Sequence, residues 1–587
     1  MPIEKRWVVK PQGDPATAAM LAAALRISPV LANLLVQRGI DTVEKAEKFF
    51  KPSLADLHDP FLMKDMDKAV ERVERAVANQ EKIMVYGDYD VDGCTAVALV
   101  YKFLRQIGHK NLMFYIPDRY TEGYGISIKG IDLAARKGVG LIIALDCGIK
   151  ATEKVVYAKT KGVDFIICDH HLPAEEIPKA VAVLDPKRVD CSYPFDELSG
   201  CGVGFKLVQA YAQKNRMPFE QILPLLDLLV VSIASDIVPL VGENRILAYF
   251  GLKNLNREPS KGLLSIIKIC GLDKHSITID DIVFKIGPRI NAAGRMRMDE
   301  NDENASPSGG HAAVELLIEG NESIAEEFGS VIDAYNQDRK SIDRSVTQEA
   351  HDYIEGNPEM KALKSTVIYN PRWMKGIVGI VASRLIETYY RPTVLTMSNG
   401  FVTGSARSVP GFDLYQAVES CSDLLENFGG HMYAAGLTMR PENVGEFTRR
   451  FNAYVEENID PQMLVPQVDI DSELLFSDIT PAFRKDLNRF QPFGPGNTAP
   501  VFATCGVSNH GDAKLVGMEC EHLRMDLMQR QKPNTKIQAI AFQQPTHYEW
   551  VRSGRPIDVC YQIVENHYRG TVTTQLRIKD IKPVLNR

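Results

Sequence analysis

The sequence predicts an α/β protein: a doubly wound parallel-sheet lobe, a long helix, a second α/β lobe and a C-terminal OB-like β-barrel. Between residues 80 and 240, apolar β-branched runs of strand length alternate with helical patterns, which is typical of a doubly wound parallel sheet. The alternation returns between 366 and 428, and from about 460 short strands are separated by turn-forming residues. With 587 residues, the chain exceeds what one hydrophobic core usually supports.

The elements of the first half follow from periodicity and stop signals. Helical spacing over 18–25, 29–38 and 43–50 predicts a helical N-terminal segment, with Pro52 and Pro60 as stops. The first sheet should contain strands at 83–86, 112–116, 141–145, 165–168 and 180–184. Helices are expected at 96–107, 126–137, 151–161 and 219–234, the last of which leads to Asp236.

The second half begins with a helical pattern over 322–355, which suits either a bridge between two lobes or a surface helix of one domain. Strands at 366–369, 393–397 and 402–405 and helices at 377–390 and 414–428 predict a second α/β lobe. Strands at 501–504, 537–542, 557–564 and 571–578 predict a barrel of OB type. The expected domains are 1–75, 76–320, 359–460 and 461–587, with 321–358 as the connecting helix.

Composition limits the class of protein. Hydrophobic residues make up 45% and charged residues 24% of the chain, as in ordinary globular domains. The net charge of −7 argues against a uniformly basic surface but leaves room for a local basic groove. Ten cysteines without a CxxC pair indicate reduced thiols and a cytoplasmic protein. The most apolar stretch, 223–240, is interrupted by Asp227 and Asp236, so no membrane association is expected.

Three aspartate-rich strings follow three of the expected strands: Asp88-Tyr-Asp-Val-Asp-Gly93, Asp146-Cys-Gly148 and Asp169-His-His171. The carboxyl ends of parallel strands lie at one edge of a sheet, where α/β proteins bind ligands. Carboxylates gathered there repel one another and are costly to desolvate unless cations neutralise them. Oxygen ligands with one or two imidazoles suit Mn²⁺ or Mg²⁺, so the strings predict a metal centre.

Each string also has a simpler interpretation. Asp-x-Asp-x-Asp-Gly matches the first half of an EF-hand loop, although the expected strand before it and the missing later Glu argue against calcium binding. Asp146 alone could be a helix N-cap, and Asp236 alone could be a charge at a helix end. In extended geometry, Asp88, Asp90 and Asp92 would all point to one side, with Gly93 allowing the turn into the next helix.

The complete set resembles the four motifs of the DHH phosphoesterases. Three further strings narrow the resemblance to the RecJ family of single-strand exonucleases: 118–125 (DRYTEGYG), 287–294 (GPRINAAG) and 429–436 (GGHMYAAG). The string at 404–408 (GSARS) fits the strand before the last of these. The resemblance spans about residues 75 to 580, and its motifs occur in the family's order.

The resemblance implies two divalent ions, Mn²⁺ or Mg²⁺, with Asp146 bridging them. The implied metal ligands are Asp90, Asp92, Asp146, His170 and Asp236. His171 would contact the scissile phosphate, so Asp146, His171 and Asp92 are the expected catalytic residues. Asp88 and Asp169 would not bind the ions themselves but would orient the side chains that do.

Residues that would bind phosphate or DNA lie in the glycine-rich strings. By resemblance they are Arg119, Arg289, Asn291, Ser405, Arg407, Gly430 and His431, although an arginine is more often a solvated surface charge and Gly429-Gly430 could be a helix C-cap. Tyr561 and Tyr568 are stacking candidates in the barrel, where aromatic residues are more often core. An acid-rich insertion at 298–310 departs from the family and puts the phosphate role of the segment after Arg289 in doubt.

The expected activity is hydrolysis of single-stranded DNA from its 5′ end to mononucleotides, in DNA repair and recombination. The partners that the resemblance suggests are single-stranded DNA, a single-strand-binding protein and a helicase. One alternative is a DHH-family phosphatase or phosphodiesterase of small nucleotides, such as a nucleoside bisphosphate, an oligoribonucleotide or a cyclic dinucleotide. Another is a non-catalytic replication scaffold. The extra barrel argues against the first alternative, and the intact acidic residues argue against the second.

Overall fold

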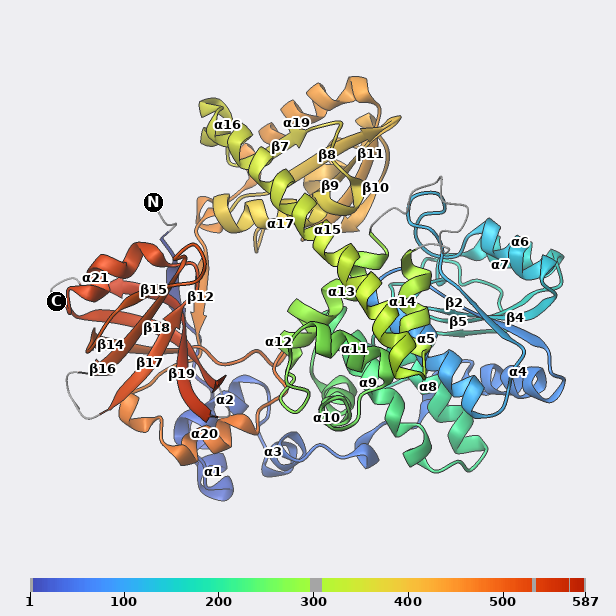
Figure 1. The fold of residues 1–587 in the computed structure, drawn as a ribbon, viewed down its shortest axis with the longest axis horizontal. Coiled ribbons are helices and arrows are strands. Elements are labelled where there is room, and N and C mark those ends of the chain that lie inside the picture. Colours follow the sequence, from blue (N-terminus) through green and yellow to red (C-terminus); the bar gives the residue numbers. More distant parts are fainter. Residues whose placement is uncertain (1–3, 296–308, 530–534, 569–570, 585–587) are drawn as a thin grey trace. The chain divides into compact units, whose positions relative to one another are not determined.

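The computed structural model describes residues 4–295, 309–529, 535–568 and 571–584. The chain forms two compact units. Figure 1 labels the helices and strands of both. The first unit consists of residues 52–342 with 492–497, and the second consists of 1–51, 343–491 and 498–587. Each unit contains a hydrophobic core of its own.

The first unit contains the predicted parallel sheet. Its strands lie in the order β3-β2-β4-β5-β6, and all neighbouring pairs are parallel. The strands are β2 (Lys82–Gly87), β3 (Leu112–Tyr115), β4 (Val139–Leu145), β5 (Asp164–Cys168) and β6 (Ala182–Leu184). Apart from the edge strand β3, nearly every side chain is buried, which explains why these strands are continuous apolar runs.

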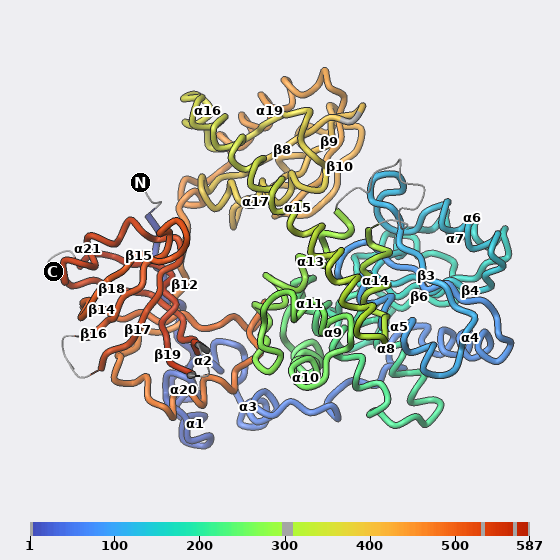
Figure 2. The backbone as a smooth tube through the Cα atoms, in the orientation of Figure 1, coloured from blue at the N-terminus to red at the C-terminus, as the bar shows by residue number. Residues whose placement is uncertain are grey.

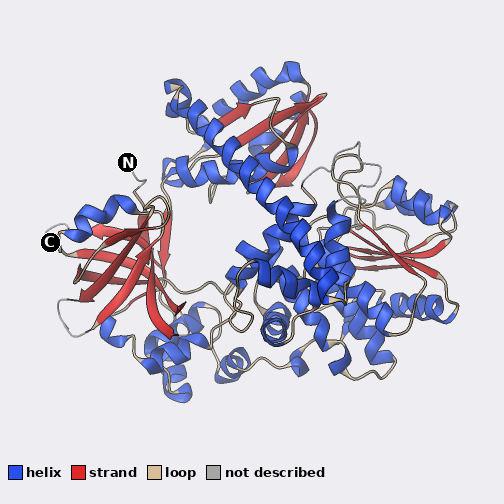
Figure 3. Ribbon diagram, in the orientation of Figure 1, coloured by secondary structure: helices blue, strands red, loops and turns tan. Residues whose placement is uncertain are grey.

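Helices cover both faces of this sheet (Figure 3). Ile83 and Val85 of β2 belong to one hydrophobic cluster, whereas Met84 and Tyr86 belong to another, because successive side chains of a strand point to opposite faces. The first cluster includes side chains of α4 (Met66–Ala78), α5 (Val91–Gln106) and α8 (Gly200–Lys214). The second includes side chains of α6 (Ile128–Arg136) and α7 (Thr152–Thr160). The doubly wound architecture is confirmed.

The helix before Asp236 is shorter than predicted. Helix α9 runs over Leu226–Ser235 and is preceded by two 3₁₀ turns, Phe219–Gln221 and Leu223–Leu225. Pro224 lacks a backbone N–H and would clash with the preceding turn, so one helix over 219–234 cannot form. The remaining helices of this unit are α10 (Gly242–Arg257), α11 (Lys261–Ile269), α12 (Ile279–Asp281), a π-helical turn (Ile282–Ile286), α13 (Gly287–Ala293) and α14 (Gly309–Ile318).

Helix α15 (Glu322–Glu355) is continuous over 34 residues and matches the predicted range. The boundary between the units falls within it, at Asp343. In the first unit, Asp333 of this helix pairs with Arg289. In the second unit, Asp343 of the helix accepts hydrogen bonds from Arg384. The helix therefore contributes residues to both units.

The second unit contains a five-stranded mixed sheet in the order β10-β11-β9-β8-β7, in which only β7 and β8 are parallel. The strands are β7 (Thr366–Tyr369), β8 (Thr393–Asn399), β9 (Phe401–Arg407), β10 (Leu425–His431) and β11 (Ala434–Met439). Its helices are α16 (Pro358–Ala362), α17 (Lys375–Tyr389), α18 (Leu414–Glu419) and α19 (Val444–Asn458).

The predicted helix over 414–428 is wrong. Helix α18 ends at Glu419, a 3₁₀ turn follows at Ser422–Leu424, and the chain then enters strand β10. Strand β10 pairs only with β11, and most of its side chains are exposed. An exposed edge strand does not show the alternation that identifies a half-buried strand. Gly429 and Gly430 therefore lie in a β-hairpin and are not a helix C-cap.

The C-terminal part of the second unit is the predicted β-barrel (Figure 3). Its strands lie in the order β13-β14-β18-β19-β17-β16-β15, and an added pairing of β14 with β16 closes the sheet. They are β13 (Ser472–Glu473), β14 (Phe502–Asn509), β15 (Lys514–Val516), β16 (His522–Gln529), β17 (Lys536–Ala541), β18 (Ile557–Tyr568) and β19 (Thr571–Pro583). Helices α20 (Pro481–Asn488) and α21 (Tyr548–Arg552) accompany them.

The N-terminal segment contains a strand that the sequence pattern did not predict. Strand β1 (Arg6–Val9) pairs in parallel with β12 (Gln467–Ile470), and both belong to the second unit. Figure 2 labels β12 and shows the course of the backbone around it. The Trp7 indole N–H donates to Asp580 Oδ2 at 2.6 Å, which ties β1 to the barrel strand β19. The predicted helices follow as α1 (Pro15–Leu25), α2 (Pro29–Gln37) and α3 (Val43–Phe50).

Among the described residues, no helix contains a stretch long and apolar enough to cross a membrane.

Candidate metal centre

Three strands of the first unit deliver aspartates to one edge of the sheet. Asp88, Asp146 and Asp169 follow β2, β4 and β5 directly, and all three side chains are buried. The Asp146 N–H donates to Cys168 O at 2.9 Å, and its φ of 58° lies in the left-handed region, where a non-glycine residue is strained. Asp146 is not a helix N-cap, because α7 begins only at Thr152.

The first aspartate string is not extended as predicted. Asp90 is the N-cap of α5, and its Oδ1 accepts a hydrogen bond from the Gly93 N–H at 3.0 Å. Asp92 lies inside the first turn of the helix, so the helix begins two residues before Gly93. A Cβ at Gly93 would meet Asp88 O at 2.4 Å, so this glycine permits close packing of helix and strand. A strand followed by a helix also excludes an EF-hand.

Asp92 is held by residues far away in the sequence. The N–H groups of Gly200 and Cys201, at the start of α8, donate to its two carboxylate oxygens at 2.7 and 2.8 Å. Ser232 Oγ donates to Asp92 Oδ1 at 2.7 Å, and Ser199 Oγ lies 2.7 Å from Ser232 Oγ. These four residues were missed in the sequence, since nothing local links them to Asp92.

His170 lies at the centre of the site. Its Nε2 is 3.2 Å from Asp146 Oδ1, 3.7 Å from Asp92 Oδ2 and 3.7 Å from Asp236 Oδ2. Both ring nitrogens are buried and lack a hydrogen-bond partner within the described ranges. Two groups have ligand atoms within 4.8 Å of one another: Asp92, His170 and Asp236, and Asp146, His170 and His171. Buried nitrogens without a hydrogen-bond partner, beside several carboxylates, fit a divalent cation.

The electrostatics of the site favour the same interpretation. Burial, followed by the charges of Asp92 and Asp90, raises the pKa of Asp146 well above its ordinary value. The same causes raise the pKa of Asp236 to about 8. Burial and Asp92 also raise the pKa of Asp90, and burial lowers the pKa of His170. Such a site binds either protons or cations, because buried carboxylates that repel one another cannot all remain charged without a neutralising positive charge.

Asp169 and His171 form a separate pair beside this centre. Asp169 Oδ1 lies 2.7 Å from His171 Nδ1, and Asp169 also accepts from the N–H groups of Ile149 and His170. Although burial alone would raise it, the pKa of Asp169 falls to about 2 because of the His171 hydrogen bond. The Tyr124 hydroxyl lies 3.2 Å from His171 Nε2. Asp169 therefore fixes the orientation of the His171 ring.

Asp88 lies behind the other carboxylates and is nearly inaccessible. Burial and then Asp90 raise its pKa well above the usual value, and only a long contact of 3.4 Å links Gly125 N to its Oδ1. The Arg119 guanidinium lies 4.9 Å from the centroid of the Tyr89 ring, and its charge opposes part of the rise at Asp88. Arg119 is therefore near the acidic cluster, and its role in binding phosphate remains a prediction.

Arg289 and Asn291 have structural contacts that were not predicted. The buried Arg289 places Nε 2.8 Å from Asp333 Oδ1 and donates from Nη1 to Lys285 O. Asn291 Oδ1 accepts the Val91 N–H at the start of α5. Their roles in binding phosphate remain predictions. The larger part of the acid-rich insertion, 298–308, lies outside the described residues.

The other predicted phosphate ligands lie in the second unit. Arg407 Nη1 donates to Ser405 Oγ at 2.8 Å, and burial lowers the pKa of Arg407. His431 ends strand β10, and Gly430 has a φ of 150°. In the barrel, Tyr561 is fully buried with its hydroxyl 2.8 Å from Thr504 Oγ1, so its predicted stacking role is wrong. The side chain of Tyr568, the other stacking candidate, is outside the described part of the chain.

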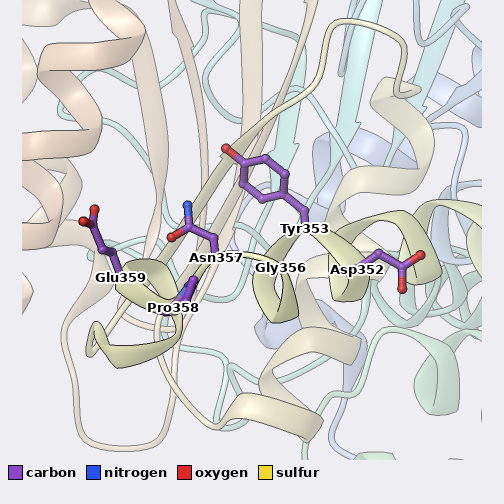
Figure 4. A pocket seen from close by; sticks show the side chains of 6 residues that line it. All are labelled: Asp352, Tyr353, Gly356, Asn357, Pro358 and Glu359. Atoms are coloured by element: carbon purple, nitrogen blue, oxygen red, sulfur yellow. The ribbon is translucent and has the colours of Figure 1, made fainter.

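A separate open depression of about 610 Å³ lies where α15 gives way to α16. Figure 4 shows its lining side chains, among them Tyr353, Asn357 and Glu359. None of its lining residues belongs to the predicted site.

Comparison with known proteins identifies three family regions. Residues 82–233 match the N-terminal domain of the DHH family, 361–457 match the DHHA1 domain, and 470–580 match the RecJ OB domain. The chain is 35% identical to the single-stranded-DNA-specific exonuclease RecJ of Bacillus subtilis, over 98% of this chain and 70% of that protein. It is 30% identical to Escherichia coli RecJ, over 95% of this chain and 96% of that protein.

A solved structure extends the likeness to the fold. The RecJ of Thermus thermophilus in complex with Mn²⁺ superposes with a TM-score of 0.80 at 26% identity, covering 98% of this chain and 79% of that one. The chain therefore belongs to the RecJ family of single-stranded-DNA-specific exonucleases.

Proposed function

We propose that this protein is an exonuclease that hydrolyses single-stranded DNA from its 5′ end to mononucleotides, in DNA repair and recombination. The observation that carries the proposal is the convergence of Asp92, Asp146 and Asp236 on the buried His170. It occurs in a chain whose full-length relatives are named single-stranded-DNA-specific exonucleases. Family membership supports the substrate, and the site supports a hydrolytic reaction.

Two divalent cations, Mn²⁺ or Mg²⁺, fit the donor set. The proposed ligands are Asp90, Asp92, Asp146, His170 and Asp236, with Asp146 shared between the ions. Carboxylate oxygens and one imidazole suit these cations, and burial together with the neighbouring carboxylates raises the pKa of Asp146 and Asp236, a cost that a cation would offset. When bound, such ions lower the pKa of water and neutralise charge on the reacting phosphate.

The protein's own residues hold this arrangement in place. Gly200, Cys201 and Ser232 fix both oxygens of Asp92, so its orientation does not depend on the substrate. Asp169 holds the His171 ring by its Nδ1, so Nε2, which lies 3.2 Å from the Tyr124 hydroxyl, is the nitrogen that would donate to a non-bridging oxygen of the scissile phosphate. In the hydrolysis, the oxygen of water joins phosphorus and the bond from phosphorus to the 3′ oxygen of the terminal nucleotide breaks. The 3′ oxygen gains the proton that water gives up.

Recognition of the strand is assigned to arginine, serine and histidine side chains. Arg119 lies near the acidic cluster of the first unit, while Ser405, Arg407 and His431 lie together in the second. Arg407 is a half-buried cation with a lowered pKa, so a phosphate would stabilise its charged form. Binding of a terminal 5′ phosphate there would account for the direction of degradation. The OB domain would lengthen the path of the strand.

The small-nucleotide alternative is not favoured. The likeness to RecJ proteins covers 95% or more of this chain in several relatives, including the OB region. A phosphatase of small nucleotides would not need such a domain. The scaffold alternative is not favoured either, because a scaffold has no need for several buried carboxylates around one histidine.

The cellular setting is also a proposal. The buried cysteines are free thiols, which supports a reducing compartment such as the cytoplasm. An enzyme specific for single strands needs its substrate to be unwound, so a helicase and a single-strand-binding protein are the proposed partners.

One assay tests class and direction together. Single strands labelled at the 5′ or the 3′ end, a blunt duplex and a nucleoside bisphosphate are incubated with the protein and Mn²⁺. We expect labelled mononucleotide to appear early from the 5′-labelled strand only. Early release from the 3′-labelled strand would contradict the polarity, and hydrolysis of the bisphosphate alone would contradict the substrate class.

A further inference from the structure

The turn between β10 and β11 exposes an aromatic ring. The last cross-strand pair of this hairpin is His431 with Ala434, so Met432 and Tyr433 form a two-residue turn. Tyr433 is 49% exposed and Met432 is 36% exposed. Large apolar side chains that remain this exposed stabilise the fold less than fully buried ones would.

This turn is firmly anchored. The Ser408 N–H donates to Tyr433 O at 3.0 Å, and the Leu414 N–H donates to Met432 O at 3.0 Å. Behind the turn, Gly430 packs so closely that a Cβ there would meet Ala434 O at 2.2 Å. The Tyr433 ring is thus presented by a backbone fixed on both sides, as a preorganised contact surface requires.

The neighbours of the ring are the candidate phosphate ligands of the second unit. Ser408, which binds the Tyr433 carbonyl, directly follows Arg407, and Arg407 pairs across the sheet with Ala434. The His431 ring centroid lies 6.3 Å from that of Tyr433, at an interplanar angle of 71°. The Tyr433 ring therefore lies beside the His431 ring, at the end of the sheet where β9 ends in Arg407.

We propose that Tyr433 is the stacking surface for a nucleobase near the 5′ end of the bound strand. A nucleotide joins an anionic phosphate to a flat aromatic base, and this end of the sheet offers a partner for each. Stacking on an aromatic side chain tolerates every base, as an enzyme that removes nucleotides of any sequence requires. This inference rests on the proposed function, because it places the base of a strand whose phosphate Ser405 and Arg407 bind.

The test compares Tyr433→Ala and Tyr433→Phe with the unaltered protein on 5′-phosphorylated single strands. We expect the Ala variant to raise KM about tenfold, an effect typical of the loss of one base–aromatic stack. The Phe variant should keep the unaltered KM, because it retains the ring face. The strands are then remade with one abasic residue at the first, second, third or fourth position. When the missing base is the one that stacks on Tyr433, the Ala variant and the unaltered protein should have the same KM.

The matched control is Phe401→Ala. Phe401 is 51% exposed and begins β9, the strand that Arg407 ends, so its ring lies at the far end of the same sheet. Its removal should leave KM unchanged. An unchanged KM for Tyr433→Ala, or a penalty that persists equally on all four abasic strands, would overturn the proposal.

Direct binding separates this inference from the proposed function. Fluorescence anisotropy with a labelled 5′-phosphorylated strand, in chelator so that no hydrolysis occurs, measures affinity for the same set of variants. Absence of cleavage by the unaltered protein would refute the exonuclease but leave the stacking measurement intact. If the unaltered protein cleaves the strand while the Tyr433→Ala and Phe401→Ala variants bind it with equal affinity, the stacking proposal is refuted and the exonuclease proposal stands.

Discussion

Ser232 donates a hydrogen bond to Asp92 across 140 residues of sequence, with Oγ 2.7 Å from Oδ1. The bond crosses from α9 to the first turn of α5 and therefore connects two helices of the doubly wound lobe at its acidic edge. It orients a predicted metal ligand from a residue that no motif identifies.

Replacing Ser232 with Ala should lower the affinity for Mn²⁺ about 10- to 100-fold, the usual cost of losing a hydrogen bond to a metal ligand. Calorimetric titration of the metal-free protein measures this directly. The control is Ser235→Ala on the same helix, because the Ser235 hydroxyl has no hydrogen-bond partner among the described residues. Equal Mn²⁺ affinities for the two variants would contradict the role of Ser232.

Asp146→Asn should reduce hydrolysis at least about a hundredfold, since a shared ligand should matter more than a residue that only orients one. Asparagine tolerates the left-handed backbone that Asp146 adopts, so the variant should keep its fold. Circular dichroism checks the fold while release of labelled nucleotide checks activity. Activity within a few-fold of the unaltered protein would refute the proposed bridging role.

Metal-free protein should become less stable as the pH rises. The pKa of Asp236 is about 8 in the folded state and 3.8 ordinarily, so the folded state binds the proton more tightly. The resulting stabilisation is complete below about pH 4 and is lost as the pH rises through about 8. Thermal unfolding in chelator between pH 5 and 9 should show Tm falling, with Mn²⁺ raising Tm more at pH 8 than at pH 5. Asp236→Asn should reduce the fall of Tm with rising pH. An equal increase of Tm by Mn²⁺ at pH 5 and pH 8 would contradict this account.

Arg407→Ala should raise KM for 5′-phosphorylated strands about tenfold or more, because hydrogen bonds to charged groups contribute about 1.5–3 kcal/mol. The effect on kcat should be small, since Arg407 is assigned to binding and not to the reacting atoms. A strand with a 5′ hydroxyl is the internal control, for which KM should change less. The same KM change on both strands would argue against a pocket for the terminal phosphate.

Gly430→Ala should distort the hairpin that presents His431. An added Cβ would lie 2.2 Å from a backbone oxygen at a φ of 150°, so the turn must shift. We expect a raised KM together with a lower Tm. Gly429→Ala is the matched control, because a Cβ there meets nothing within 4 Å. A functional loss of equal size in both variants would contradict this steric explanation.

Much of the fold was predictable because buried parallel strands and amphipathic helices leave strong local patterns. The strands that carry Asp146 and Asp169 are continuous apolar runs, and the range of α15 follows from its periodicity. Strand β10 was mistaken for helix because it is an exposed edge, where pairing through the backbone leaves no apolar alternation in the sequence.

The site was predictable only where its residues lie within motifs. Asp90 and Asp92 were identified, but their geometry was wrong because the helix begins before Gly93. The contacts of Gly200 and Ser232 with Asp92 depend on the packing of α8 and α9. Arg289 likewise forms an ion pair with Asp333 of α15. Such pairings between distant segments leave no trace in the spacing of either one.

The pairing of β1 with β12 affects how the protein is synthesised. Arg6 and Gln467, whose side chains are hydrogen-bonded, are 461 positions apart. A nascent chain leaving the ribosome must therefore keep β1 unpaired until β12 has been translated. Contacts over so great a separation form slowly. We expect this part of the second unit to mature only after β12 has been synthesised, and substitutions in β1 to disturb a domain encoded far downstream.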